Sequence, residues 1–333
     1  MTTTVFVSGA SGYIASQTVA ELISRGYDVV GSVRSAAKGD PLVSYFGNKF
    51  KYEVVRTLEQ EGAFNESLKR HPEVTYFLHT ASPAVFVAED NEKEILLPAI
   101  NGTKFLLQSI KNYAPQIKGV VITSSMIAMV SPEDLDNPKF AGGESFWSDI
   151  AYEDGLKDSH AAYRVSKTFA EKAAWEFVEK EGPNFTLTTI NPALVFGPQA
   201  NDESAKGTLN VTAEIVSSIY KLNKDDKLPR IAGPFADVRD VAKAHVLAIE
   251  KEDAQGQRII VCAQRFNAQS ILNILRKNFP DLQDKLPVGN PADDDFSPYL
   301  PFNDIKSREI LGLDYISLEQ CVVDSINQIR RVN

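Results

Sequence analysis

Short apolar runs and longer segments with helical spacing alternate along the first 190 residues. Val5-Phe6-Val7 forms an apolar run, and the pattern from Tyr13 to Arg25 has helical spacing that ends at Gly26. Runs that are apolar throughout indicate strands buried on both faces, and helices between them are typical of a doubly wound parallel sheet. The predicted fold class is therefore α/β. The predicted strands are 5–7, 28–33, 52–55, 74–79, 120–122 and 185–190, and the predicted helices are 13–25, 98–113 and 160–180.

Two segments break this rhythm. Residues 131–159 contain prolines and glycines without clean periodicity, so we expect a long loop, which in a compact domain is more often functional or mobile than inert. After Asn191-Pro192 the pattern changes again, with helical spacing at 209–222, 238–249 and 318–329 and a strand at 258–262. A chain of 333 residues corresponds to about two domains. We expect a large parallel-sheet domain and a smaller, discontinuous α+β domain; their residues are 1–190 plus about 232–260, and about 191–231 plus 261–333.

Charge and composition exclude several classes of protein. The net charge of −9, from 35 Lys and Arg against 44 Asp and Glu, argues against a nucleic-acid binder. No apolar run reaches the roughly 20 residues of a membrane-spanning helix, and the first residues do not resemble a secretory signal. Cys262 and Cys321 are too few and too far apart for a disulfide framework or a metal knuckle. We expect a cytoplasmic protein without a metal site or a membrane partner.

A glycine-rich turn connects the first strand to the first helix. Gly9, Gly12 and Ala15 have the spacing G-x-x-G-x-x-A. Glycine permits a tight turn and a close approach of the backbone to a pyrophosphate, and the free N–H groups of the helix stabilise its charge. This position predicts a dinucleotide-binding loop. The alternative is an ordinary strand-to-helix turn.

The end of the second strand indicates which dinucleotide is bound. An NAD site usually places an acidic residue there, about 20 residues after the glycine loop, to bind the ribose 2′-hydroxyl. This chain has Arg34, with Lys38 four residues later, and Asp28 lies at the other end of the strand. Two cations would pair with a 2′-phosphate. NADPH is therefore favoured over NADH, unless both cations are only solvated surface residues.

Tyr163 and Lys167 have the spacing of side chains that share one face of a helix. A nearby ammonium lowers the pKa of a phenol, which suits it to protonate a carbonyl oxygen as hydride arrives. A surface pair is the alternative. At the end of the fifth strand, Ser124 or Ser125 could donate a hydrogen bond to the substrate oxygen, but neighbouring strand residues point to opposite faces, so only one can serve.

Together these residues resemble the extended short-chain dehydrogenase/reductase superfamily, which has a Rossmann core. Within it the chain is similar to the yeast NADPH-dependent methylglyoxal and 3-methylbutanal reductases, and more distantly to plant dihydroflavonol and cinnamoyl-CoA reductases. The resemblance extends almost from end to end. Its motifs lie at 7–15 (VSGASGYIA), 79–83 (HTASP), 98–103 (PAINGT), 123–125 (TSS), 167–177 (KTFAEKAAWEF), 191–198 (NPALVFGP) and 237–245 (DVRDVAKAH).

The resemblance implies roles for individual residues. It selects Ser125, with Tyr163 and Lys167, as the catalytic set. Thr57 and Leu58 stand where relatives often have an acidic and an aliphatic residue, so contacts to the adenine are altered. The implied cofactor contacts are Gly9, Ala10, Ser11, Gly12, Tyr13, Ile14, Arg34, Lys38, Thr57, Leu58, Thr80, Ala81, Tyr163, Lys167, Pro192, Val195 and Thr212. The expected substrate pocket comprises Phe86 and three positions at which relatives often have an aromatic residue; this chain has Ala84, Met126 and Leu194 there. We also expect the 131–159 loop to form part of its wall.

The predicted function is reduction of aldehydes or ketones to alcohols by hydride transfer from NADPH, with Tyr163 as proton donor. The NADP-binding domain is the large one, and the smaller domain binds a small-molecule carbonyl substrate. An NAD-dependent sugar-nucleotide epimerase and a catalytically silent NADPH-binding regulator are the alternatives. The sequence leaves open whether the chain forms a homodimer.

Three residues near position 240 suggest a structural role rather than a catalytic one. We expect Asp237, Arg239 and Asp240 to form an ion-pair network at the domain junction. His79, His160 and His245 lack the spacing of metal ligands, and we expect a structural or surface role for each.

Overall fold

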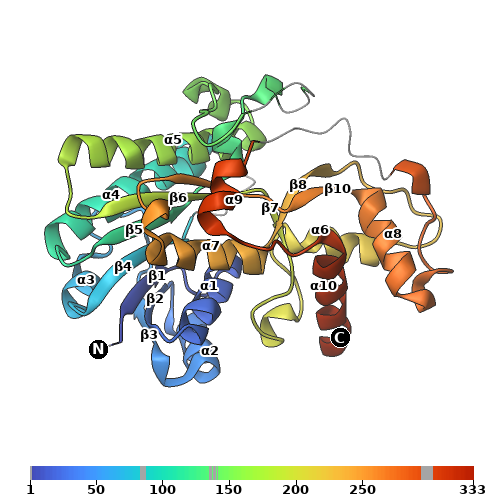
Figure 1. The fold of residues 1–333 in the computed structure, drawn as a ribbon, viewed down its shortest axis with the longest axis horizontal. Coiled ribbons are helices and arrows are strands. Elements are labelled where there is room, and N and C mark those ends of the chain that lie inside the picture. Colours follow the sequence, from blue (N-terminus) through green and yellow to red (C-terminus); the bar gives the residue numbers. More distant parts are fainter. Residues whose placement is uncertain (1, 83–87, 135–136, 138–139, 141, 294–302) are drawn as a thin grey trace.

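A seven-stranded parallel sheet forms the larger part of the molecule (Figure 1). The structure is a computed structural model that describes residues 2–82, 88–134, 137, 140, 142–293 and 303–333. The strand order is β3-β2-β1-β4-β5-β6-β9, so the direction of winding reverses between β1 and β4. The strands are β1 (Thr4–Ser8), β2 (Asp28–Val33), β3 (Phe50–Val54), β4 (Val74–His79), β5 (Gly119–Thr123), β6 (Thr186–Pro192) and β9 (Arg258–Val261). The predicted α/β fold with a doubly wound parallel sheet is confirmed.

Helices cover both faces of this sheet because its strands are apolar on both sides. On β1, Val5 and Val7 pack in one buried cluster with α1 and α7, whereas Phe6 points to the other face and packs with α3, α4 and α5. Phe6 stacks on Phe77 of β4 with ring centroids 4.7 Å apart. These helices are α1 (Tyr13–Ser24), α3 (Asn65–Arg70), α4 (Leu97–Tyr113), α5 (Ser159–Glu181) and α7 (Val238–Glu250).

A three-stranded sheet of order β10-β8-β7 lies on the other side of the molecule (Figure 1). Its phenylalanines pack with the helices around it, and Phe196 and Phe266 meet edge to face at 4.7 Å. The strands are β7 (Leu194–Phe196), β8 (Ala232–Asp237) and β10 (Gln264–Asn267), and the helices are α6 (Ala213–Tyr220), α8 (Ala268–Asn278) and α10 (Leu318–Val332).

The structure differs from the expected division of the chain in two places. β8, which we placed in the large domain, pairs with β7 and β10 in the small sheet, so the chain returns to the large sheet only at α7. α9 (Ile305–Leu311), expected in the smaller domain, brings Leu311 into the apolar cluster around α1 and α7. The domain limits themselves remain a prediction.

Several elements have no counterpart in the predictions. α2 (Ala36–Phe46) contains Gly39 and Pro41, which obscure its helical pattern. β7 and β10 have three and four residues, too few for a recognisable period, and β8 contains Gly233 and Pro234, which are depleted in strands. The described parts of 131–159 contain short 3₁₀ turns and an isolated β-bridge between Gly143 and Asn303, and α5 begins at Ser159, so most of the segment is the expected loop. None of the helices among the described residues has the length and apolarity needed to cross a membrane.

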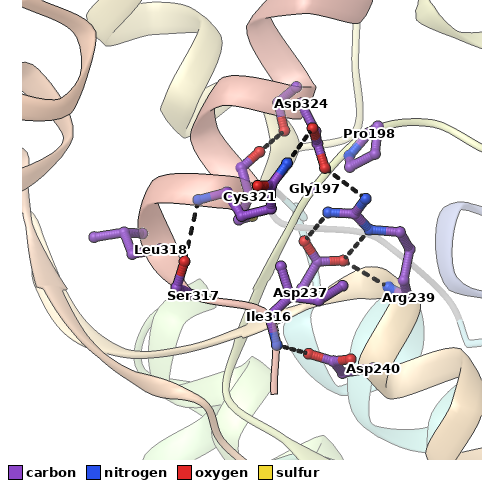
Figure 2. Close-up of polar contacts among 12 residues, drawn as sticks. Gly197, Pro198, Asp237, Arg239, Asp240, Ile316, Ser317, Leu318, Cys321 and Asp324 are labelled. Carbon is purple, nitrogen blue, oxygen red and sulfur yellow. Dashed lines mark hydrogen bonds and ion pairs between the residues drawn. The ribbon is translucent and has the colours of Figure 1, made fainter. Parts of the chain in front are cut away.

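An ion-pair network joins α7 to α10 beside the small sheet (Figure 2). Arg239 donates to the buried Asp237 at 2.8 Å and to Asp324 of α10 at 2.7 Å. The prediction is confirmed for Asp237 and Arg239. Asp240 pairs with Lys243 at 3.4 Å rather than with Arg239, and its carboxylate also accepts the Ile316 N–H at 2.7 Å.

Candidate active site

The glycine loop lies at the point where the winding of the large sheet reverses. Gly9 has a φ of +68°, and a Cβ at this position would lie 3.0 Å from the Cβ of Ala81. The chain then enters α1 at Gly12, where no side chain caps the first N–H groups and the first turn holds no acidic residue. An open helix N-terminus beside a loop without side chains fits a bound pyrophosphate.

Ser8 fixes the neighbouring end of β4. Its hydroxyl bonds to His79 Nδ1 at 2.8 Å and accepts the N–H groups of Thr80 and Ala81 at 3.1 Å. Burial, with a smaller effect of the Lys167 charge, lowers the pKa of His79 to about 3, so this ring is neutral. His79 therefore has a structural role: it bonds to Ser8, whose hydroxyl holds Thr80 and Ala81 beside the glycine loop.

Arg34 and Lys38 lie directly after β2, at the start of α2, and both are exposed. Neither side chain has an ion pair or a hydrogen bond among the described residues. Thr57 is exposed and Leu58 half-buried after β3, at the same edge of the sheet. The structure thus brings all four residues to the edge at which the sequence places the cofactor.

Ser125, Tyr163 and Lys167 meet at the carboxyl end of β5. Ser125 precedes a 3₁₀ turn, Met126–Met129, and its side chain forms a hydrogen bond with Tyr163. Lys167, one turn further along α5, donates to the carbonyl oxygen of Thr123 at 3.5 Å. Ser124 points the other way and donates to Glu171 at 2.5 Å. Only Ser125 of the two serines therefore faces the phenol.

The electrostatics of this group differ from the prediction in one respect. Burial raises the pKa of Tyr163, and the hydrogen bond with Ser125 counteracts part of this rise, whereas we expected Lys167 to lower it. Burial also lowers the pKa of Lys167 to about 8, although the nearby charge of Glu171 raises it. Desolvation is therefore the largest effect on the pKa of both Tyr163 and Lys167.

A buried carboxylate supports the group from behind, which the sequence analysis missed. Glu171 accepts hydrogen bonds from Asn191 at 2.7 Å and Arg258 at 2.6 Å, besides Ser124. The same Asn191 amide also donates to the carbonyl oxygen of Ser125 at 3.2 Å. An acidic residue eight positions after Tyr163, on the same side of the helix, was the available signal.

A cavity of about 1470 Å³ extends from the start of α1 past Ser125, Tyr163 and Lys167 to the small sheet. It is lined by Gly12–Ala15, Thr80, Ser125, Tyr163, Lys167, Pro192 and Val195, and at its other end by residues around the small sheet, including 228–234 and 267–269. Thr212, Met126 and Leu194 also line it. Ala84 and Phe86 lie outside the described residues.

The 131–159 loop does not form a wall of this cavity in the part that the structure describes, contrary to our expectation. Arg258 holds the loop instead: its Nη1 donates to the carbonyl oxygens of Glu144 and Phe146, and its guanidinium lies 3.5 Å from the ring centroid of Trp147. These contacts keep the loop against the outer strand β9.

The sequence matches a family model over residues 5–263, that of the NAD dependent epimerase/dehydratase family. The chain belongs to this family. Within it, the NADPH-dependent methylglyoxal reductase GRE2 of Saccharomyces cerevisiae is 40% identical, with 98% of this chain and 97% of that protein covered.

Two solved structures agree with this fold over nearly the whole chain. A reductase engineered to attenuate substrate inhibition in asymmetric catalysis is 58% identical with a TM-score of 0.96, covering 99% of this chain and all of the other. Gre2 of Candida albicans in complex with NADPH is 44% identical with a TM-score of 0.97, covering 99% of each chain. The predicted resemblance to the yeast reductases is confirmed.

Proposed function

We propose that this protein reduces aldehydes or ketones to alcohols with NADPH. The observation that carries the proposal is the hydrogen bond between Ser125 and Tyr163, beside Lys167, on the wall of a cavity that begins at a dinucleotide-type glycine loop. The yeast relative is an NADPH-dependent methylglyoxal reductase, which makes 2-oxo aldehydes good first substrates to test.

Bound NADPH would supply the hydride to the carbonyl carbon. Tyr163 donates its phenolic proton to the carbonyl oxygen, and Ser125 orients that oxygen through a second hydrogen bond. Lys167 supplies a positive charge on the same helical face, which stabilises the phenolate left on Tyr163. The buried wall of the site excludes water and so strengthens each of these interactions.

Groups from several elements would hold the cofactor. The N–H groups at Gly12–Ile14 would bind the pyrophosphate, together with the turn Gly9–Ser11. Arg34 and Lys38 would pair with the 2′-phosphate, and Thr57 and Leu58 would contact the adenine. Tyr163 and Lys167 would hold the nicotinamide half, together with Thr80, Ala81, Pro192, Val195 and Thr212.

Tyr163→Phe tests the central assignment. We expect turnover to fall at least about 100-fold, since a general acid contributes about 10²- to 10⁴-fold. NADPH binding should change little, because the ring and its packing remain. Loss of NADPH absorbance is followed with aldehydes, α-dicarbonyls, β-ketoesters and diaryl ketones, and NADPH affinity by calorimetry. Tyr113→Phe, at an exposed position on α4, is the matched control. A Tyr163→Phe variant with most of the wild-type rate would contradict the proposal.

The alternatives make different demands on the same residues. A sugar-nucleotide epimerase that retains NAD would favour an acidic residue after β2, where this chain has Arg34. A silent NADPH-binding regulator would not need the Ser125–Tyr163 contact. For the location we propose the cytoplasm, because Cys262 and Cys321 are both free and buried, as in a reducing compartment. A homodimer stays a prediction that light scattering would test.

A further inference from the structure

Arg164 places a cation without a partner on the wall of the cavity. It follows Tyr163 on α5 and lines the same cavity. Its Nη1 atom is buried and has no hydrogen-bond partner, and no described residue forms an ion pair with the guanidinium. Two other lining residues of the cavity, Ile127 and Val130, follow Ser125 in the chain and are apolar.

A guanidinium N–H without a hydrogen-bond partner destabilises the folded protein unless a ligand accepts from it. A guanidinium stays charged in proteins, so burial, which lowers the pKa of Arg164, does not neutralise it. Arg164 is partly buried, and its buried Nη1 loses water without gaining a hydrogen bond, which is unfavourable for the folded state. An anionic group in the cavity would supply the partner that this atom lacks.

The charge of the cavity supports an anionic ligand. The described residues that line it carry one carboxylate, that of Asp293, and three cations: Arg164, Lys167 and Arg230. This balance is opposite in sign to the net charge of −9 of the whole chain. The phosphates of the cofactor are assigned to α1 and to the turn after β2, which leaves Arg164 on α5 for the substrate.

We propose that Arg164 binds a carboxylate of the substrate, so that the enzyme accepts 2-oxo acids in addition to neutral carbonyl compounds. This inference rests on the proposed function. Tyr163 and Arg164 are adjacent on α5, with Cα atoms about 3.8 Å apart, and both line the same cavity, so one small molecule bound there can contact both side chains. The planar guanidinium matches the two oxygens of a carboxylate, while the adjacent keto group receives the proton of Tyr163.

The test compares phenylglyoxylate with its uncharged methyl ester, which carries the same keto group. For Arg164→Met we expect the ratio of kcat/KM for the acid to that for the ester to fall about 10- to 100-fold, the value of one or two charge-assisted hydrogen bonds. The loss should lie mainly in KM, because the guanidinium does not touch the reacting atoms. Arg164→Lys should recover part of the ratio, since it keeps the charge and loses the planar fork.

Arg331→Met, at an exposed position far along the chain on α10, is the control and should keep the wild-type ratio. Melting temperature and NADPH affinity establish that each variant is folded, and Arg164→Gln serves as a second neutral variant. An unchanged acid-to-ester ratio in folded Arg164→Met or Arg164→Gln overturns the inference, as does a wild type that reduces the ester and not the acid. A wild type that reduces no carbonyl compound at all contradicts the proposed function itself.

Discussion

Arg258 donates from Nε to the carboxylate of Glu171 at 2.6 Å, and the side chains are only 9% and 0% exposed. The pair joins the outer strand β9 to the middle of α5, one turn after Lys167. Glu171 in turn accepts from Ser124 and Asn191, and Asn191 also holds the backbone of Ser125. The buried carboxylate of this pair thus holds the backbone of Ser125 through Asn191 and raises the pKa of Lys167.

Glu171→Gln should loosen the hold on Ser125 and lower the pKa of Lys167 further. Removing one partner of a buried pair costs about 3 kcal/mol or more in free energy of unfolding. The charge of Glu171 raises the pKa of Lys167, so its loss should move the alkaline limb of the pH profile, expected near pH 8, to lower pH. The profile of kcat/KM for NADPH reports the groups of the free enzyme. Glu176→Gln on the same helix removes an exposed partner of Lys180 and should change neither quantity. An unmoved limb in a folded Glu171→Gln variant would refute the coupling.

Arg34→Glu should reverse the preference for the cofactor. A carboxylate at this exposed position repels a 2′-phosphate and can instead accept from a ribose 2′-hydroxyl. We expect the ratio of kcat/KM for NADPH to that for NADH to fall at least about tenfold, since charged hydrogen bonds contribute about 1.5–3 kcal/mol. Arg70→Glu, on α3, is the control. If the ratio stays at the wild-type value, other residues recognise the 2′-phosphate.

Arg239→Met should destabilise the junction between α7 and α10 (Figure 2). The fully buried Asp237 would lose its cation, which costs about 3–5 kcal/mol in free energy of unfolding. Arg331 also ties α10 to another segment, through Asp202, but this pair is exposed and should contribute at most about 1 kcal/mol. Urea unfolding of Arg239→Met and Arg331→Met compares the two. Equal losses would mean that burial does not determine the strength of these pairs.

The buried histidines should make the fold sensitive to acid. Burial lowers the pKa of His245 to about 4, while its ring bonds to Thr123 at 2.7 Å. Between about pH 6.5 and pH 4 the unfolded chain therefore binds more protons, so stability is full above this range and falls as the pH is lowered through it.

In His245→Gln this share of the pH dependence, on the order of 3 kcal/mol, should disappear. His160→Gln, at an exposed position, is the control and should keep the wild-type pH dependence. Chemical unfolding at pH 4.5 and pH 7.5 measures the difference for all three proteins. If the free energy of unfolding changes equally between the two pH values in His245→Gln and in the wild type, His245 is not the group that titrates.

Local patterns along the chain were sufficient for the large sheet, its strand-helix alternation, the glycine loop and the Tyr163–Lys167 spacing. These features depend on neighbours in sequence: apolar runs, helical period and the need for small residues in a turn. The strands β7, β8 and β10 depend on partners distant in the chain, such as Phe235 opposite Gln264. Their own sequences show little of the residue pattern that predicts a strand.

Tertiary structure alone decided which side chains lose water and which find a partner. It buried Glu171 against Arg258, left Arg164 without a counter-ion in the cavity, and raised rather than lowered the pKa of Tyr163. Each of these outcomes depends on the distance between segments far apart in sequence and on desolvation, which the identity of a residue and its immediate neighbours do not determine.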